Sequence, residues 1–322
     1  MHYTLEYTYN LTMLPTWVLF ALFAELLWVA GNIFDKYLLE HYFGEDEEGG
    51  PGALLIFSSY FSLVFVLGIS LLSFDKIDFS LSAGLFGILV GLCNGLWILL
   101  YLYALNRADL SQVIPLFQTI PIFGLLFGYI FLQETITVAQ GSAAAVIIFG
   151  ALILLLSKKH GVLRMDTTTL VLMISASATV ACTESLFKLV ALDINYWSAA
   201  FWMSLGFSIF GISLYILVPK LKKEFTKLIR NKKKHVLRMN SVNELFDNFA
   251  ELIFLSAVVL GPIALVQSIN AYQPLLILLA GAMATIWIPK YFDEDLSKNS
   301  LFQKAVGILI ITLGSIFFYH VI

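Results

Sequence analysis

Charged side chains are scarce in this chain. Only 13% of its 322 residues are Asp, Glu, Lys or Arg, roughly half of the share that soluble domains carry. Hydrophobic residues make up 59%, and the mean hydropathy is +0.86. So much apolar surface cannot be hidden inside a water-soluble globule of this size. The composition therefore excludes a soluble fold and predicts an integral membrane protein.

Several features that would carry other chemistry are also missing. Residues 1–14 contain no Lys or Arg, so the basic start of a secretory signal peptide is absent and the first apolar run is expected to be retained. Cys93 and Cys182 stand in apolar runs, which suits packed thiols better than a disulfide or a metal pair. The sequence has no zinc-protease motif and no glycine-flanked catalytic serine, and its histidines lie at ends or in loops. An enzyme is therefore not expected, and neither is a metal or a cofactor.

Long apolar runs fill the chain instead. A bilayer core of roughly 30 Å needs about 20 mostly apolar residues for each helix, and ten runs of that kind occur. They are too long and too uniformly apolar for the strands of a β-barrel. We therefore expect an all-α integral membrane fold with ten transmembrane helices. The expected helices cover residues 15–37, 54–73, 82–105, 109–132, 138–157, 168–190, 197–218, 243–261, 263–288 and 301–320.

Positive charge is distributed unevenly among the predicted loops. Of the 19 lysines and arginines, all but Lys76 and Lys188 fall in loops that follow odd-numbered runs. Basic loops remain in the cytoplasm, so both termini are expected outside, with the cell inner or plasma membrane as the location. The most basic of these loops, 219–242, is interpreted as a topology anchor alone or as an amphipathic helix on anionic lipid. So short a tract does not predict nucleic-acid binding. Its apolar residues at helical spacing are Leu221, Phe225 and Leu228.

The two halves of the sequence resemble each other. At an offset of 152 residues, Leu26–Leu39 lies over Ala178–Ala191, with Lys36 on Lys188. At an offset of 153, Pro121 falls on Pro274, and the last runs of the two halves also correspond. Matches in the same order at near-constant offset indicate a duplication.

The duplication predicts the domain organisation. We expect a tail over 1–14, a first five-helix repeat over 15–157, a linker over 158–167 and a second repeat over 168–322 that contains the basic loop. Because five is odd, the second copy must insert upside down relative to the first. Inverted repeats of this kind are typical of secondary transporters, whose site lies near mid-membrane between the repeats.

Certain segments resemble a known family. The segments are Gly31–Lys36 at the end of the first run, the short junction Ala104–Ala108, Val113–Pro121, Glu134 after the fourth run, and the glycines Gly150 and Gly314 in the last run of each half. Together they are similar to the drug/metabolite transporter superfamily and, within it, to the ten-helix EamA-like transporters. The resemblance implies a central cavity lined by the first, third, fourth, sixth, eighth and ninth helices. The chain departs from the family pattern at Trp287–Ser297, an insertion without a Gly-Glu pair. Many members have cytoplasmic termini, whereas the charge distribution predicts the opposite orientation.

Polar residues inside the runs mark the candidate site. A charged side chain at the bilayer centre costs about 2.5–3.5 kcal/mol, so each one requires an explanation. Glu25 stands deep in the first run with Trp28 and Asn32 on the same helical face, and Glu251 is the deepest carboxyl of the eighth run. The predicted substrate-binding or proton-coupling residues are Glu25, Trp28, Asn32, Asn94, Gln118, Glu184, Lys188, Asp247, Glu251 and Asn270.

Structural roles compete with these assignments. Asp35 and Lys36 lie near a helix end and are expected to snorkel to the interface. Glu184 and Lys188 are one turn apart, and they either neutralise each other or serve the site. Glu244 is attributed to the headgroup region, and the amides of the runs either join helices or face a cargo.

The carboxyls favour a transporter. A carboxyl withdrawn from water can load and release a proton as access alternates, and beside aromatic faces it can hold an organic cation. We therefore expect a secondary active transporter of a small polar or cationic metabolite, with protons and membrane lipid as further partners and a homodimer left open. One alternative is a lipid-carrier or nucleotide-sugar-type translocator, which would favour a basic pocket. The other is a non-transporting scaffold, which has no reason to bear buried carboxyls.

Overall fold

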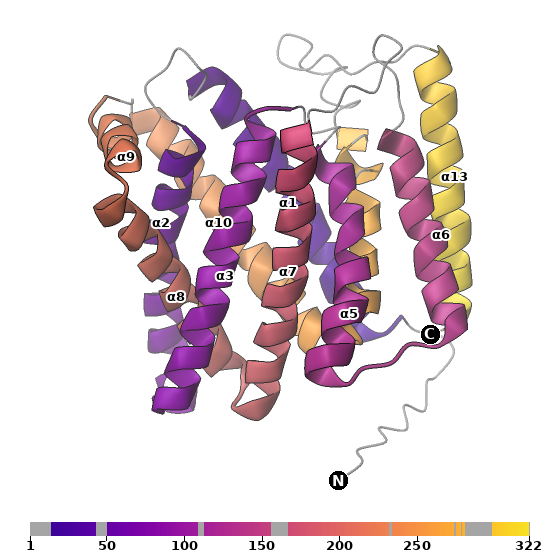
Figure 1. Ribbon diagram of the computed structural model, residues 1–322, viewed down its shortest axis with the longest axis horizontal. Helices are drawn as coiled ribbons and strands as arrows, with labels where there is room; N and C mark the ends of the chain where they lie inside the picture. Colours follow the sequence, from indigo (N-terminus) through magenta and orange to yellow (C-terminus); the bar gives the residue numbers. More distant parts are fainter. Residues whose placement is uncertain are drawn as a thin grey trace.

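Where the structure describes the predicted apolar runs, they are helical. The computed structural model describes residues 14–42, 50–108, 113–155, 167–231, 234–273, 275–277, 279–280 and 298–321, and no strand occurs among them. The elements are α1 (Thr16–Tyr42), α2 (Pro51–Ser73), the 3-10 turn η1 (Phe74–Lys76), α3 (Leu81–Leu105), the 3-10 turn η2 (Ile114–Thr119), α5 (Ile120–Leu132), α6 (Val138–Leu155), α7 (Thr167–Asp193), α8 (Tyr196–Leu217), α9 (Pro219–Asn231), α10 (Lys234–Leu260), α11 (Ile263–Ser268), the 3-10 turn η3 (Ile269–Tyr272) and α13 (Lys298–Val321) (Figure 1).

Several of these helices suit a membrane. Five are long and apolar enough to cross one by length and composition, and they cover Thr16–Leu38, Pro51–Lys76, Leu81–Leu105, Thr167–Asp193 and Tyr196–Leu217. Apolar side chains also cover the outside, where Leu71 and Leu72 expose 85% and 81% of their surface. Such an outer surface is unfavourable in water and is matched by lipid hydrocarbon. The protein is therefore an all-helical, multi-pass integral membrane protein in its described part.

The fourth and ninth predicted runs are not continuous α-helices. In the fourth, η2 precedes α5, and prolines at 115 and 121 remove backbone donors that a regular helix would use. In the ninth, η3 follows α11 after six residues. The tail 1–13, the linker residues 158–166 and the insertion Trp287–Ser297 lie outside the described residues.

The basic segment 219–242 is helical in its described part, as one of its two interpretations expected, but its apolar face does not lie on lipid. It contains α9 and the beginning of α10, which starts at Lys234 rather than at 243. Leu221 and Leu228 of α9 are buried, and the ring of Phe225 stacks 5.6 Å from that of Tyr60 in α2. The apolar face of α9 therefore packs on the protein, chiefly on α2 and α8, rather than on lipid.

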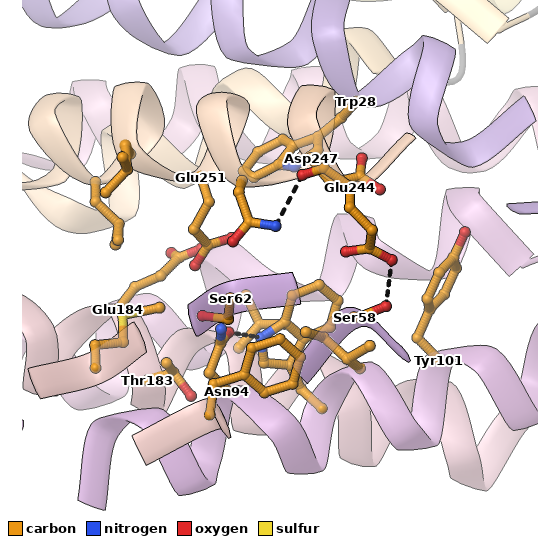
Figure 2. A pocket seen from close by; sticks show the side chains of 18 of the residues that line it. Trp28, Ser58, Ser62, Asn94, Tyr101, Thr183, Glu184, Glu244, Asp247 and Glu251 are labelled. Carbon is orange, nitrogen blue, oxygen red and sulfur yellow. Dashed lines mark hydrogen bonds between the residues drawn. The ribbon is translucent and has the colours of Figure 1, made fainter. Parts of the chain in front are cut away.

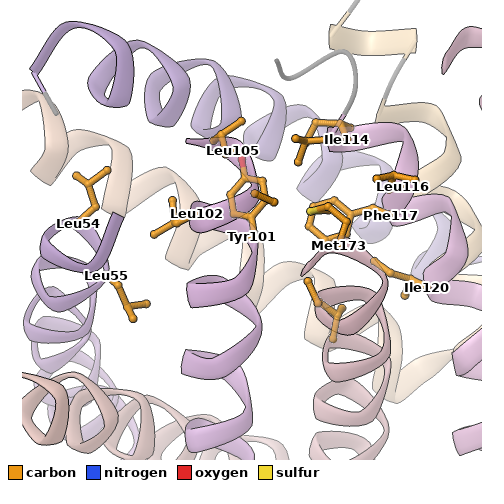
Figure 3. Packing of buried hydrophobic residues seen from close by; sticks show 14 of the residues in the cluster. Leu54, Leu55, Tyr101, Leu102, Leu105, Ile114, Leu116, Phe117, Ile120 and Met173 are labelled. Carbon is orange, nitrogen blue, oxygen red and sulfur yellow. The ribbon is translucent and has the colours of Figure 1, made fainter. Parts of the chain in front are cut away.

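The helices pack across the two halves of the chain. Helix α1 packs along α10, α3 along α7 and α8, and α2 along α8. Helices α6 and α13 form a pair at one end of the molecule, and α9 lies at the other (Figure 1). One buried cluster joins α2, α3, η2 and α5 of the first half to Met173 of α7 (Figure 3).

Two glycines allow α3 and α8 to touch through their backbones. A Cβ atom on Gly91 would lie 2.6 Å from the Cα of Gly206, and a Cβ on Gly206 would lie 3.0 Å from the Cα of Gly91. No real Cβ contact is that short against backbone, so a side chain at either position must separate the helices. This crossing holds the wall of the cavity described below.

Replacing Gly91 with Ala tests the crossing. We expect Gly91→Ala to destabilise the protein by about 1–3 kcal/mol, because the helices must move apart to admit the methyl group. Gly68→Ala is the matched control, since nothing lies within 4 Å of its added Cβ, and it should be neutral or slightly stabilising. Thermal unfolding in detergent measures both, and equal shifts would contradict the backbone contact.

Candidate functional site

A cavity lies in the interior between the two halves. It encloses about 150 Å³ and is lined by residues of α1, α2, α3, α7, α8 and α10, together with η2, η3 and the start of α5. An engineered apolar cavity of about that size holds benzene, so the space admits a small organic molecule rather than water alone. Figure 2 shows the polar side chains that converge on it.

Two neighbouring helices supply most of the carboxyls. On α1, Glu25 and Asp35 share the face that also carries Trp28 and Asn32, because their spacing follows the helical period. On α10, three acidic residues spaced by three and four positions form a second stripe, and α1 packs along α10. The carboxyl-bearing residues of the lining are Glu25, Asp35, Glu184, Glu244, Asp247 and Glu251.

The first of these carboxyls has no partner. Glu25 is 0% exposed, and both of its carboxylate oxygens are buried without a hydrogen-bond partner. Glu184 of α7 accepts a hydrogen bond of 2.7 Å from the side-chain amide of Gln267. Glu184 also lies within electrostatic range of both Glu25 and Glu251, and in Figure 2 its side chain and that of Glu251 point toward one another. Three carboxyls therefore share this end of the cavity with one neutral donor.

Two of the remaining carboxyls also accept hydrogen bonds from neutral donors. Asp35 accepts a 2.8 Å hydrogen bond from the amide of Asn243, and Glu244 accepts one from the hydroxyl of Ser58. A carboxylate oxygen of Asp247 occupies the space that a side chain at position 31 would need, so Gly31 permits its approach to α1.

Aromatic side chains form the wall between these groups. The indole N–H of Trp97 donates to Asn94 at 2.5 Å, and the hydroxyl of Tyr101 donates to Asn32 at 2.7 Å. The rings of Trp97 and Tyr101 both lie against Phe117, at centroid distances of 6.3 and 5.5 Å. These bonds fix the rings at the cavity surface.

The lining contains six carboxyls and no Lys, Arg or His among the described residues. Ionised carboxylates in a space withdrawn from water are strongly destabilising unless a cation or a proton compensates them. The protein supplies no cationic side chain here. The chemistry available to the cavity is therefore the binding of protons or of a positively charged molecule.

Eight of the ten predicted site residues line the cavity, and two do not. Gln118 lies outside the lining and donates a 3.0 Å hydrogen bond to the carbonyl of Asn270, which joins η2 to η3. Lys188 also lies outside it. The eight that line it are Glu25, Trp28, Asn32, Asn94, Glu184, Asp247, Glu251 and Asn270.

The interpretation in which Glu184 and Lys188 neutralise each other is wrong, because each has another partner. The ammonium of Lys188 forms an ion pair of 2.5 Å with Glu134, which follows α5, and donates at 2.6 Å to the carbonyl of Gly261. The second carboxylate oxygen of Glu134 accepts the backbone N–H of Ile263 at 2.7 Å. We call this set of contacts the Lys188 clamp.

Two further expectations are corrected. Asp35 does not snorkel but lines the cavity, and Lys36 donates to the carbonyls of Ala108 at 3.1 Å and Leu105 at 3.4 Å. Glu244 is 5% exposed and bonded to Ser58 rather than placed among headgroups. The i, i+3 and i, i+7 spacing with Asp247 and Glu251 was the available signal for Glu244. No sequence pattern indicated Ser58, because its hydrogen bond to Glu244 arises only from the packing of distant segments.

Comparison with known proteins agrees with this architecture. Residues 15–156 match the EamA-like transporter family. A solved crystal structure with no functional name aligns with a TM-score of 0.67 and 14% identity over 94% of this chain and 95% of that one, which shows a shared fold. No curated protein matches the chain.

The isolation of Glu25 predicts an unusual stability effect. We expect Glu25→Met to raise the thermal unfolding temperature, because it removes a buried carboxyl whose missing partner costs about 1–3 kcal/mol. Glu134→Met should lower it, since Lys188 then loses its partner. Equal destabilisation by both variants would mean that Glu25 has a structural role.

Proposed function

We propose that the protein is a secondary transporter, because residues 15–156 match the EamA-like transporter family, which is part of the drug/metabolite transporter superfamily. It moves a small polar or cationic molecule by alternating access. The observation that carries the proposal is the interior cavity, whose lining in the described part of the chain has six carboxyls and no Lys, Arg or His. A scaffold has no use for such a site, and a phosphate-bearing cargo would be repelled from it.

The packing supports an inverted repeat of five plus five helices. By the sequence offset, α7 corresponds to α1 and α10 to α3, and the contact of α1 with α10 has its counterpart in the contact of α7 with α3. The pairs α2 with α8, α5 with α11, and α6 with α13 each join corresponding helices of the two halves. The 3-10 turns η2 and η3 also correspond and touch each other beside the cavity. Broken helices at the interface of repeats are characteristic of transporter sites.

The contacts of two lysines also support the proposed repeat. Lys188 donates to the carbonyl of Gly261 where α10 ends, and Lys36 donates to the carbonyl of Ala108 just after α3 ends. The lysines are 152 residues apart and the two carbonyls 153, which matches the offsets of the repeat. An inverted repeat places such equivalent contacts toward opposite sides of the membrane.

The Lys188 clamp is the contact that alternation must break. Gln133 ends α5 in a left-handed conformation (φ 55°), and the chain then carries Glu134 onto residues of the second half. The halves cannot separate at this end while the carboxylate of Glu134 binds both Lys188 and the N–H of Ile263. By the charge distribution, this end faces outside and the basic α9 faces the cytoplasm.

Transport in proteoliposomes tests the carboxyls. Uptake of a mixture of amino acids, amines, sugars and nucleotides is driven by an imposed pH gradient and read by mass spectrometry. We expect Glu25→Gln and Glu251→Gln each to reduce uptake at least about tenfold, as for the loss of one charge-assisted contact. Asp193→Asn removes an exposed carboxyl from the end of α7 and serves as control. Full pH-driven uptake by both glutamine variants would refute the role of the carboxyls.

Accessibility of the cavity tests the clamp. In a Cys93→Ser, Cys182→Ser background, Thr183→Cys places a thiol in the lining. We expect Glu134→Gln to speed its labelling by a membrane-impermeant maleimide from the side of the α5–α6 connection. The exchange removes half of an ion pair whose Lys side chain is only 7% exposed, at a cost of about 3 kcal/mol.

Glu224→Gln is the control for that experiment, because it breaks the 4.0 Å surface pair with Lys220, whose side chain is 82% exposed. Its labelling rate should equal that of the parent. Unchanged labelling in Glu134→Gln would show that the clamp does not hold this end closed.

A further inference from the structure

The carboxyls of the cavity form a row rather than one cluster. Glu244 and Glu251 stand seven residues apart on one face of α10, so they are separated by about 10 Å along the helix. Glu25 and Asp35 stand ten residues apart on α1, about 15 Å. The two helices run in opposite senses, since Asp35 bonds Asn243 near the start of α10.

Each end of the row therefore receives carboxyls from both helices. We call Glu25, Glu184 and Glu251 the Glu25 end. We call the other set, Asp35, Glu244 and Asp247, the Asp35 end. Asp247 stands between Glu244 and Glu251 on the same face of α10, so the row of carboxyls is continuous along that helix.

Neither end is compensated by the protein. Among the described residues, these carboxylates accept side-chain hydrogen bonds from neutral groups: a glutamine amide at the Glu25 end, and an asparagine amide and a serine hydroxyl at the Asp35 end. Glu25 lies in the lining, fully buried, with both carboxylate oxygens unpartnered. An unpartnered buried acceptor facing a cavity requires a donor from the cargo, and two anionic ends require positive charge at two places.

The spacing disfavours a compact metal ion. Among the described residues, no group of three or more acidic, His or Cys side chains is placed to hold one. The cavity is also lined by Trp97, Tyr101 and Phe117, whose rings lie within 6.4 Å of one another by their centroids. Aromatic faces suit methylene groups and ammonium ions rather than hydrated metal ions.

We propose that the cargo is a linear dication, in which a short aliphatic chain carries an ammonium group at each end. One ammonium is held at the Glu25 end and the other at the Asp35 end, with the methylenes against the aromatic wall. One bound diamine then supplies positive charge to the carboxyls of both ends and loses its translational freedom only once. A bound monoamine supplies positive charge to the carboxyls of one end only. The space of about 150 Å³ suits about six non-hydrogen atoms. This inference rests on the proposed transport function.

Binding of matched amines to the purified full-length chain tests the proposal. The probes are 1,4-diaminobutane and butylamine, titrated calorimetrically at equal ionic strength, with magnesium chloride as the inorganic competitor. We expect the diamine to bind at least about tenfold more tightly, the effect of one added charge-assisted contact. Across diamines of increasing length, affinity should pass through a maximum, because the two ends have a fixed separation.

Variants assign the two ends. Glu244→Gln should reduce the preference for the diamine over butylamine at least about fivefold while leaving butylamine binding within about twofold. Glu25→Gln should also reduce that preference. Asp193→Asn, exposed and outside the lining, should change neither affinity.

Equal affinities for the two amines would overturn the proposal of a dicationic cargo. Affinities that do not change with diamine length, or displacement of the diamine by equimolar magnesium, would also overturn it. The length series uses the unaltered chain, so it decides even if a variant fails to fold. If a neutral or singly charged compound shows Glu25-dependent uptake while diamines do not bind, the dication is refuted and the transporter stands. If no compound is taken up, the proposed function itself fails.

Discussion

The cost of withdrawing carboxyls from water is the constraint on which this architecture depends. Each of the six in the cavity is a liability in a membrane unless a proton, a donor or a cation accompanies it. The fold satisfies them unequally: Glu244, Asp35 and Glu184 receive neutral donors, and Glu25 receives none. Stability alone would favour apolar residues at these positions. Their retention in one connected space is best explained by a cargo that brings the missing charge.

Lys188 and Lys36 do not line the cavity that contains those carboxyls. Lys188 and Lys36 bind carbonyl groups at the junctions that follow the third helix of each half, outside the cavity lining. The described lining of the cavity thus contains carboxyls without Lys, Arg or His, whereas Lys188 and Lys36 join separate segments of the chain. The Lys188 contact includes a carboxylate of the other half, Glu134. The residue at the repeat offset from Glu134 is Trp287, which cannot form an ion pair. The sequence therefore does not repeat the acidic member of this ion pair at the corresponding position of the second half.

Much of the fold was predictable because lipid imposes a simple rule on sequence. A long apolar run must satisfy its backbone internally, so the described part of each predicted run is helical. Glu25, Asp247 and Glu251 could be selected because a carboxyl deep in such a run has few explanations. The ion pair of Lys188 could not be predicted, because its partner Glu134 lies 54 residues away in the sequence. The same holds for α9, whose charges suggested lipid while its buried Leu221 and Leu228 face protein. Long-range pairing of polar groups is decided by packing geometry, and local patterns do not encode it.

In the proposed transport cycle, the carboxyls of the cavity exchange protons for a cationic cargo. Calorimetric titration of the purified protein with 1,4-diaminobutane, repeated in two buffers of different ionisation enthalpy, measures the protons released for each molecule bound. The account predicts release of protons from the unaltered chain and a smaller release from Glu25→Gln. Binding without any proton release, at an affinity that Glu25→Gln does not change, would contradict it.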